Sequence, residues 1–163
     1  MIFILATLTA GYYSYLYIEY IFHKSSHKKY MGYIHTLHNN HHKIYPTTKL
    51  LRKESYISST AICNYISDGT LAFGPPVLVV LLGVYDFIPY IYNMLLITEI
   101  GILFFISEHL HDNYHIEGSY LEKYDWFLKQ REYHFKHHKY HKYNFMLGGF
   151  DPIMDKIFNT YKE

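Results

Sequence analysis

Apolar blocks alternate along this chain with polar stretches rich in histidine. The first apolar block covers residues 1–22 and contains one ionisable side chain, Glu19. A helix of this length rises about 30 Å, which is roughly the thickness of the hydrocarbon layer of a membrane. We therefore expect an uncleaved membrane anchor. A cleaved signal peptide is the alternative, but the block lacks a basic leading region, and cleavage would leave Glu19 close to a new N-terminus.

A second apolar block, residues 71–107, is about twice as long as a single membrane span. Glycine and proline mark its start, and the sequence YDFIP supplies turn residues in its middle. The pattern predicts a helical hairpin with arms over 75–84 and 90–107. The first arm is short, so it either extends upstream through 56–66 or only dips into the membrane. A buried hairpin in a soluble protein is the alternative, but so long a stretch without Lys or Arg favours a membrane.

Basic and histidine residues gather in two islands on either side of this hairpin. All fifteen Lys and Arg residues lie between Lys24 and Lys53 or between Lys123 and Lys162. An anchor followed by a hairpin places both islands on one face of the membrane, and their positive charge predicts the cytosolic face. In a eukaryotic cell we expect the endoplasmic reticulum. The net charge of +1 gives no reason to propose nucleic acid as a partner.

The histidines repeat one spacing, HxxxH followed by HxxHH. It appears as HKSSH and HNNHH in the first island and as HDNYH and HFKHH in the second. Residues three or four apart share one helix face, and neutral imidazoles there can bind an ion at about 2 Å. Ten nitrogen ligands are too many for one ion and suit two; they favour Zn, Fe, Cu or Ni over Ca or Mg. The ten histidines are His23, His27, His38, His41, His42, His111, His115, His134, His137 and His138.

Five further residues are candidates for hydrogen bonds to the ligand rings, with ordinary surface positions as the alternative. They are His35, His109, His141, Glu108 and Asp112. His109 is also an alternative to His111 as the ligand that pairs with His115. Glu99 lies inside the second arm of the hairpin, where an ionisable group is expected to face the interior of the helix bundle. The single cysteine, Cys63, is expected to be a buried apolar residue.

These four histidine motifs together resemble the membrane fatty acid hydroxylase and sterol desaturase superfamily. The similarity covers nearly the whole chain from His23 onward, including the tail HFKHHKYHKYNFMLGGFDPIMDKIFNTY. HHKIYP is loosely similar to the fatty acid 2-hydroxylase branch. The chain departs from the family pattern in three ways. We expect one upstream span fewer than the family has and a short first arm of the hairpin, and Asn159 stands where the family has glycine before Thr160.

The resemblance implies four membrane helices around a cytosol-facing metal cap. For this chain we expect a single all-α membrane domain over 1–163, a bundle of about three spans or one span plus a hairpin. Its parts are the anchor at 1–22, the first island at 23–53, the hairpin at 71–107 and the second island at 108–163. Within it, the ten histidines would hold two iron ions on the cytosolic side, with zinc as a substitute in purified protein. The implied activity is O2-dependent hydroxylation of a lipid, an acyl chain, sphingolipid or sterol. Electrons would come from a separate cytochrome b5 or ferredoxin system. Lipid desaturation on the same scaffold and non-enzymatic metal binding in the membrane are the alternatives.

Overall fold

The computed structural model describes residues 2–53, 88–148 and 152–163. Within these ranges the chain is helical between its turns, and the one bridge is an isolated pair, Arg52 with Ile116. The expected all-α fold is therefore confirmed for this part of the chain. The first predicted arm, 75–84, its upstream extension and Cys63 lie outside the described residues. The elements are α1 (Ile2–Ser26), η1 (Lys29–Met31), α2 (Tyr33–Ile44), α4 (Tyr90–Tyr114), η3 (Tyr120–Lys123), α5 (Asp125–Lys139) and α6 (Ile153–Ile157).

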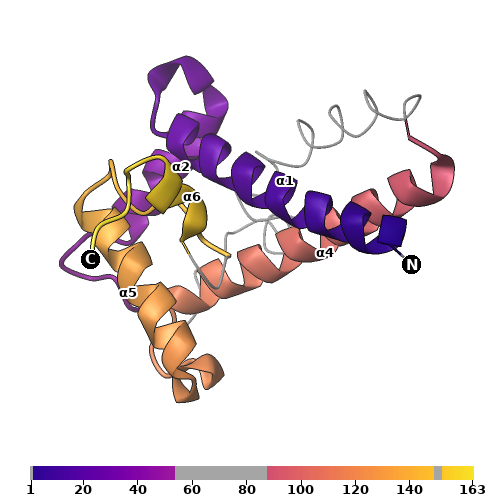
Figure 1. The fold of residues 1–163 in the computed structure, drawn as a ribbon. Coiled ribbons are helices and arrows are strands. Elements are labelled where there is room, and N and C mark those ends of the chain that lie inside the picture. Colours follow the sequence, from indigo (N-terminus) through magenta and orange to yellow (C-terminus); the bar gives the residue numbers. More distant parts are fainter. Residues whose placement is uncertain (1, 54–87, 149–151) are drawn as a thin grey trace.

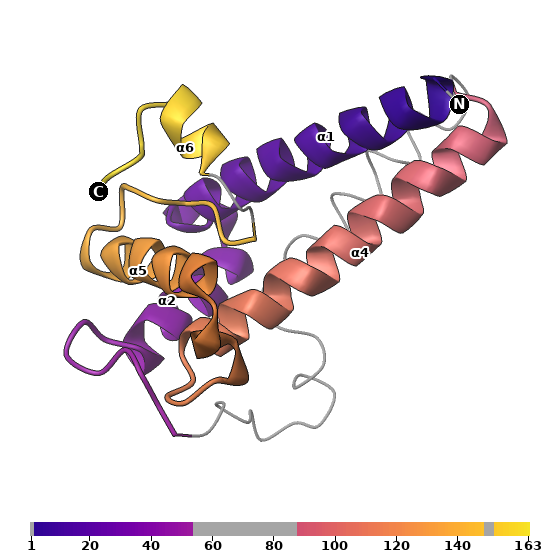
Figure 2. The same cartoon turned by 60° about the horizontal axis from the view of Figure 1, so that its bottom comes forward.

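Two long helices, α1 and α4, lie side by side and run in the same direction (Figures 1 and 2). Tyr15, Leu16 and Tyr20 of α1 are buried in one core cluster with Ile100 of α4. The rings of Tyr15 and Phe104 meet edge to face with their centroids 5.5 Å apart. Because both helices run the same way, both deliver the polar islands that follow them to the same end of the molecule.

The shorter helices α2, α5 and α6 gather at that end and form a cap (Figure 2). Phe127 of α5 is fully buried and packs against Tyr114 at a centroid distance of 5.3 Å. Arg131 of α5 donates to the carbonyl oxygens of Asn113 and Ile116 at 3.1 and 3.0 Å. Carbonyls at the end of a helix lack partners within it, so this arginine fixes the end of α4 to the cap.

Both long helices continue beyond the apolar blocks that predicted them. The second arm was expected to end at residue 107, but α4 continues to Tyr114. No glycine or proline interrupts the sequence there, so the backbone hydrogen bonds of the helix continue into the polar island. Similarly, α1 reaches Ser26 rather than stopping at residue 22. The first histidines of each island therefore stand on continuous extensions of the apolar helices.

Among the described residues, one helix, Tyr90–Tyr114, is long and apolar enough to cross a membrane, by length and composition alone. Only 17% of its most apolar stretch is buried, whereas the core helix of a soluble protein would be mostly covered. The helix α1 has the same length but does not meet the same test of length and composition; it contains five tyrosines and Glu19. Several large apolar side chains on these helices are exposed, among them Phe3, Leu5 and Phe105.

The turn at the C-terminus shows how Asn159 is accommodated before Thr160. Asn159 adopts a left-handed conformation with φ of 54°. Glycine adopts this conformation freely, and asparagine tolerates it better than most residues do. The backbone amide of Thr160 then donates to the carbonyl oxygen of Asp155 at 2.8 Å. Asparagine is thus compatible with the backbone conformation that this turn requires.

Candidate metal centre

The ten predicted ligands come together in the cap, at the ends of α1 and α4 and along α2 and α5. They include two groups of four histidines in which the ligand nitrogens of each group lie within 4.8 Å of one another. The first group is His23, His27, His38 and His137. The second group is His41, His115, His134 and His138. The two remaining predicted ligands, His42 and His111, adjoin one group each.

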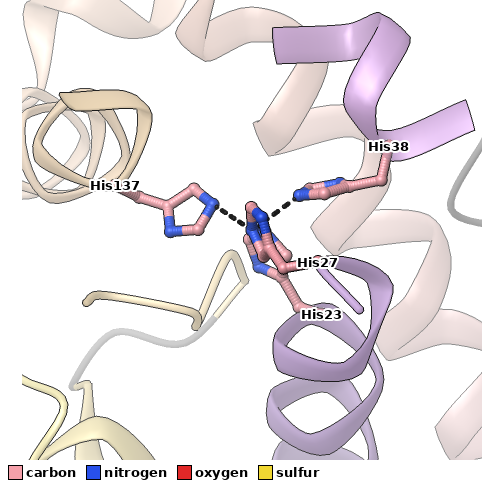
Figure 3. A group of neighbouring side chains, drawn as sticks. All are labelled: His23, His27, His38 and His137. Atoms are coloured by element: carbon pink, nitrogen blue, oxygen red, sulfur yellow. Dashed lines mark hydrogen bonds between the residues drawn. The ribbon is translucent and has the colours of Figure 1, made fainter. Parts of the chain in front are cut away.

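In the first group, four rings converge from three directions (Figure 3). The Nε2 atom of His27 lies 3.0 Å from Nε2 of His137 and 2.9 Å from Nε2 of His38. His42 adjoins this group, since its Nε2 atom lies 3.0 Å from Nε2 of His38. The cap thus brings residues more than one hundred positions apart onto one small volume, as the two-island pattern predicted.

The second group is centred on His134. Its Nε2 atom lies 2.9 Å from Nε2 of His115 and 3.1 Å from Nε2 of His138. The Nε2 atom of His41 lies 3.1 Å from that of His138 and 3.2 Å from that of His111. Such separations are close to those between ligands about 2 Å from a shared ion. The first group together with His42, and the second group together with His111, therefore each offer five imidazole nitrogens.

Four of these rings are oriented by backbone carbonyl oxygens. Nδ1 of His115, His137 and His138 lies 2.8 Å from the carbonyl oxygens of Leu50, Tyr143 and Tyr45, respectively. His23 makes the same contact to the carbonyl of Phe145. Because a carbonyl oxygen only accepts, Nδ1 must carry the proton, which leaves the Nε2 lone pair free to bind a cation. This arrangement is typical of metal-bound histidine.

The centre contains polar contacts that hydrogen bonds alone do not satisfy. His115 and His138 both present Nε2 lone pairs to Nε2 of His134, which can carry one hydrogen and point it at one of them. In the first group, Nε2 of His23 is buried and has no hydrogen-bond partner among the described residues. Buried polar atoms are normally paired. A cation bound in each group would pair with the unmatched lone pairs around His134 and with Nε2 of His23. These residues therefore fit a metal ion that prefers nitrogen ligands.

Burial also keeps the rings in the neutral form that binds metal. Loss of solvation lowers the pKa of His115 to about 3 and that of His138 to about 4. The pKa values of other ligands outside the long apolar helices fall well below their ordinary value, first through burial and then through repulsion between neighbouring rings. These are His38, His41, His134 and His137. Neutral imidazole is the ligand form, so the centre is ready for metal at neutral pH.

The three histidines outside the motifs occupy different places. Nδ1 of His35 donates to the carbonyl oxygen of Ser26 at 2.9 Å and joins α2 to the end of α1. His109 is exposed and contacts the Tyr120 hydroxyl at 2.7 Å. The structure therefore places His111, and not His109, beside the second group.

His141 lies at the rim of the first group. Its ring is exposed, and the ring centroid is 4.5 Å from that of His42 and 5.6 Å from that of His27. Glu108 is half-buried and Asp112 is exposed. The role of these two carboxylates as partners of ligand rings stays a prediction.

Sequence reasoning missed the groups that orient the ligand rings. The partners of four Nδ1 atoms are backbone carbonyls, for which no side-chain pattern exists. It also missed two buried carboxylates beside these carbonyls, Glu19 and Asp155. Their sequence signals were weak: an acid inside an apolar block, one turn before His23, and an acid in the tail.

No family model matched the sequence, and no curated protein or solved structure matched it.

Proposed function

We propose that this protein is a membrane-bound oxygenase that uses two iron ions and O2 to hydroxylate a lipid. The observation that carries the proposal is the pair of adjacent, all-nitrogen groups at the end of two apolar helices. Structural zinc sites commonly use four ligands, often with cysteine. Two groups of five imidazoles instead suit a pair of redox-active ions.

The chain's own residues hold, orient and shield the metal position. Three of the four orienting carbonyls belong to Tyr45, Leu50 and Tyr143, and each fixes a ligand ring at 2.8 Å. The ligands His134 and His137 are almost fully buried, which limits access of water. Bound iron would supply the reduction of O2 and the oxidation of a C–H bond, chemistry that side chains do not perform.

The position of the centre supports a lipid as the substrate. Both α1 and α4 end at the cap, and the exposed apolar side chains Phe3, Leu5 and Phe105 lie along these two helices. We propose that α4 spans the membrane, with α1 beside it, and that an acyl chain or sterol reaches the centre from the bilayer. The basic residues of the cap favour the cytosolic face, where a separate protein such as a cytochrome b5 or ferredoxin would supply electrons.

Metal analysis of protein purified from iron-replete cells tests the proposal. We expect about two iron ions per chain in the wild type and about one or none in His134→Ala, since His134 is central to the second group. His109→Ala is the matched control and should keep both ions, because His109 is exposed and faces Tyr120. Cells that express the wild-type protein and are supplied with isotopically labelled O2 should also accumulate a lipid that carries the labelled oxygen.

Two results would overturn the proposal. One is a protein that binds zinc or nickel, exchanges it freely and tolerates His134→Ala, which would indicate metal storage. The other is an iron-loaded protein that yields no oxidised lipid when O2 and a reductant are supplied. A new double bond in place of a hydroxyl group would replace hydroxylation with desaturation on the same scaffold.

A further inference from the structure

We propose that Glu19 and Asp155 are positioning residues for the first metal site. They would act through the backbone of residues 143–148, whose carbonyl oxygens orient His137 and His23. This inference rests on the proposed two-metal centre and adds a feature that affects one of its two sites. One of the two sites depends on buried carboxylates that do not themselves touch the metal.

Residues 143–148 form a short segment that follows α5 and runs beside the first group. The carbonyl oxygen of Tyr143 accepts from Nδ1 of His137 at 2.8 Å, and that of Phe145 accepts from Nδ1 of His23. Both of these histidines belong to the first group. The orientation of two of its four rings therefore depends on where this segment lies.

Asp155 holds the middle of the segment. It is completely buried, and its Oδ1 and Oδ2 atoms accept from the backbone amides of Phe145 and Met146, both at 2.9 Å. The amide of Met146 and the carbonyl of Phe145 belong to one peptide unit. Asp155 is thus joined to His23 through a single peptide group. A carboxylate on the N–H side polarises the carbonyl and strengthens its hydrogen bond to the ring.

Glu19 holds the end of the same segment. It lies one turn before His23 on α1 and is buried. Its Oε2 atom accepts from the amides of Leu147 and Gly148 at 3.3 and 3.4 Å. Its Oε1 atom accepts from the hydroxyl of Tyr15 at 2.7 Å, and also from that of Ser107 on α4. Together the two carboxylates accept from four successive backbone amides.

The second group depends on a different segment, the one that follows α2. The carbonyls of Tyr45 and Leu50 orient His138 and His115. Arg52 fixes this segment, because its backbone amide donates to the carbonyl of His115 at 2.9 Å. Disturbing residues 143–148 should therefore loosen the first site and leave the second intact.

The variant Asp155→Asn tests this inference. In either orientation of its amide, the asparagine NH2 group faces the backbone N–H of Phe145 or Met146, so one hydrogen bond is lost. We expect one of the two ions to be removed by about tenfold less chelator than in the wild type. The second ion should be retained as before. Glu132→Gln is the matched control, because Glu132 is an exposed acid on α5 paired with Lys136.

Double variants identify the site that is affected. With His137→Ala, which removes a ligand of the first group, Asp155→Asn should change the release of the remaining ion little. With His134→Ala, which removes a ligand of the second group, Asp155→Asn should weaken the binding of the remaining ion about tenfold. The opposite pattern would overturn the inference.

A pair of substitutions at Glu19 provides an independent test should Asp155→Asn fail to fold. Gln at this position can turn its oxygen to the amides of Leu147 and Gly148 and its NH2 group to the hydroxyls of Tyr15 and Ser107, which can accept. We therefore expect Glu19→Gln to retain both ions and Glu19→Leu to lose one ion preferentially.

The remaining outcomes separate the two proposals. If the wild type does not bind two ions, the proposed function fails and this inference fails with it. If the wild type binds two ions and Asp155→Asn and Glu19→Leu release both like the wild type, only the inference is overturned. Equal loss of both ions with a lowered unfolding temperature would show a general structural role and would also overturn it.

Discussion

Each oriented histidine in the centre has two distinct ring nitrogens with separate tasks. In His115, for example, Nδ1 donates to the carbonyl of Leu50, and Nε2 faces His134. The spacing of the histidines was enough to predict which ten rings gather. It could not predict the carbonyl partners, because every residue has a carbonyl and its direction depends on tertiary structure. The same limit hid the role of Asp155, whose partners are backbone amides.

The low pKa values of the buried rings predict an acid-sensitive metal-free protein. In the folded state the pKa is about 3 for His115 and about 4 for His138, whereas an unfolded histidine titrates near 6.5. Below about pH 6.5 the unfolded chain therefore binds more protons, and the free energy of unfolding falls as the pH falls. Above that pH this contribution is constant.

Thermal unfolding in the presence of chelator, followed by circular dichroism from about pH 8 to pH 5, checks this prediction. The unfolding temperature should be flat at first and then decline. His115→Ala should show a shallower decline, because one of the buried rings is gone. An unfolding temperature that stays constant down to pH 5 would contradict the assignment of neutral buried rings.

At the scale of helices, the contact between α1 and α4 holds together the two helices that end at the cap. The sequence predicted that Glu99 faces the interior of the bundle, and the structure places its carboxylate against Gly11 of α1. Helix ends were harder to predict, since polar residues at 108–114 do not stop a helix that lacks glycine and proline. The end of α4 depends instead on contacts with Arg131 of α5.

Gly11 leaves room for the side chains of Glu99 and Leu96 at this helix contact. A Cβ atom added there would overlap the carboxylate of Glu99 and lie 3.1 Å from a methyl carbon of Leu96. We expect Gly11→Leu to lower the free energy of unfolding by about 1–3 kcal/mol through overpacking. Gly101→Leu on α4 is the matched control, since nothing lies within 4 Å of the added Cβ atom.

Thermal unfolding in detergent, measured with metal analysis, checks this prediction. Gly11→Leu should unfold at a lower temperature than Gly101→Leu and should lose metal as the helices separate. Equal stability of the two variants would show that the packing of α1 on α4 tolerates a side chain at residue 11.

For the whole molecule, the parallel course of α1 and α4 brings both polar islands to one end (Figures 1 and 2). Charge segregation along the sequence predicted this arrangement without any knowledge of helix packing. Residues 54–87, which precede α4, lie outside the described residues, so the number of membrane crossings stays a prediction.

Accessibility of single cysteines to a membrane-impermeant reagent tests the topology. In a Cys63→Ser background, Lys28→Cys and Lys139→Cys should react from the same face, since both positions are exposed on the cap. Ile2→Cys should react only from the opposite face, because it lies at the far end of α1. Reaction of Lys28→Cys and Lys139→Cys from different faces would rule out a shared cap.

Neighbouring residues on the cap helices belong to different groups. His137 faces the first group and His138 the second, both from α5, while His38 and His41 divide in the same way on α2. A rotation of either helix therefore moves ligands of both groups at once. Ions bound in the two groups would therefore both restrict the motion of α2 and α5. Hydrogen exchange of the backbone amides of these two helices should accordingly be faster in the metal-free protein than in the protein with two ions.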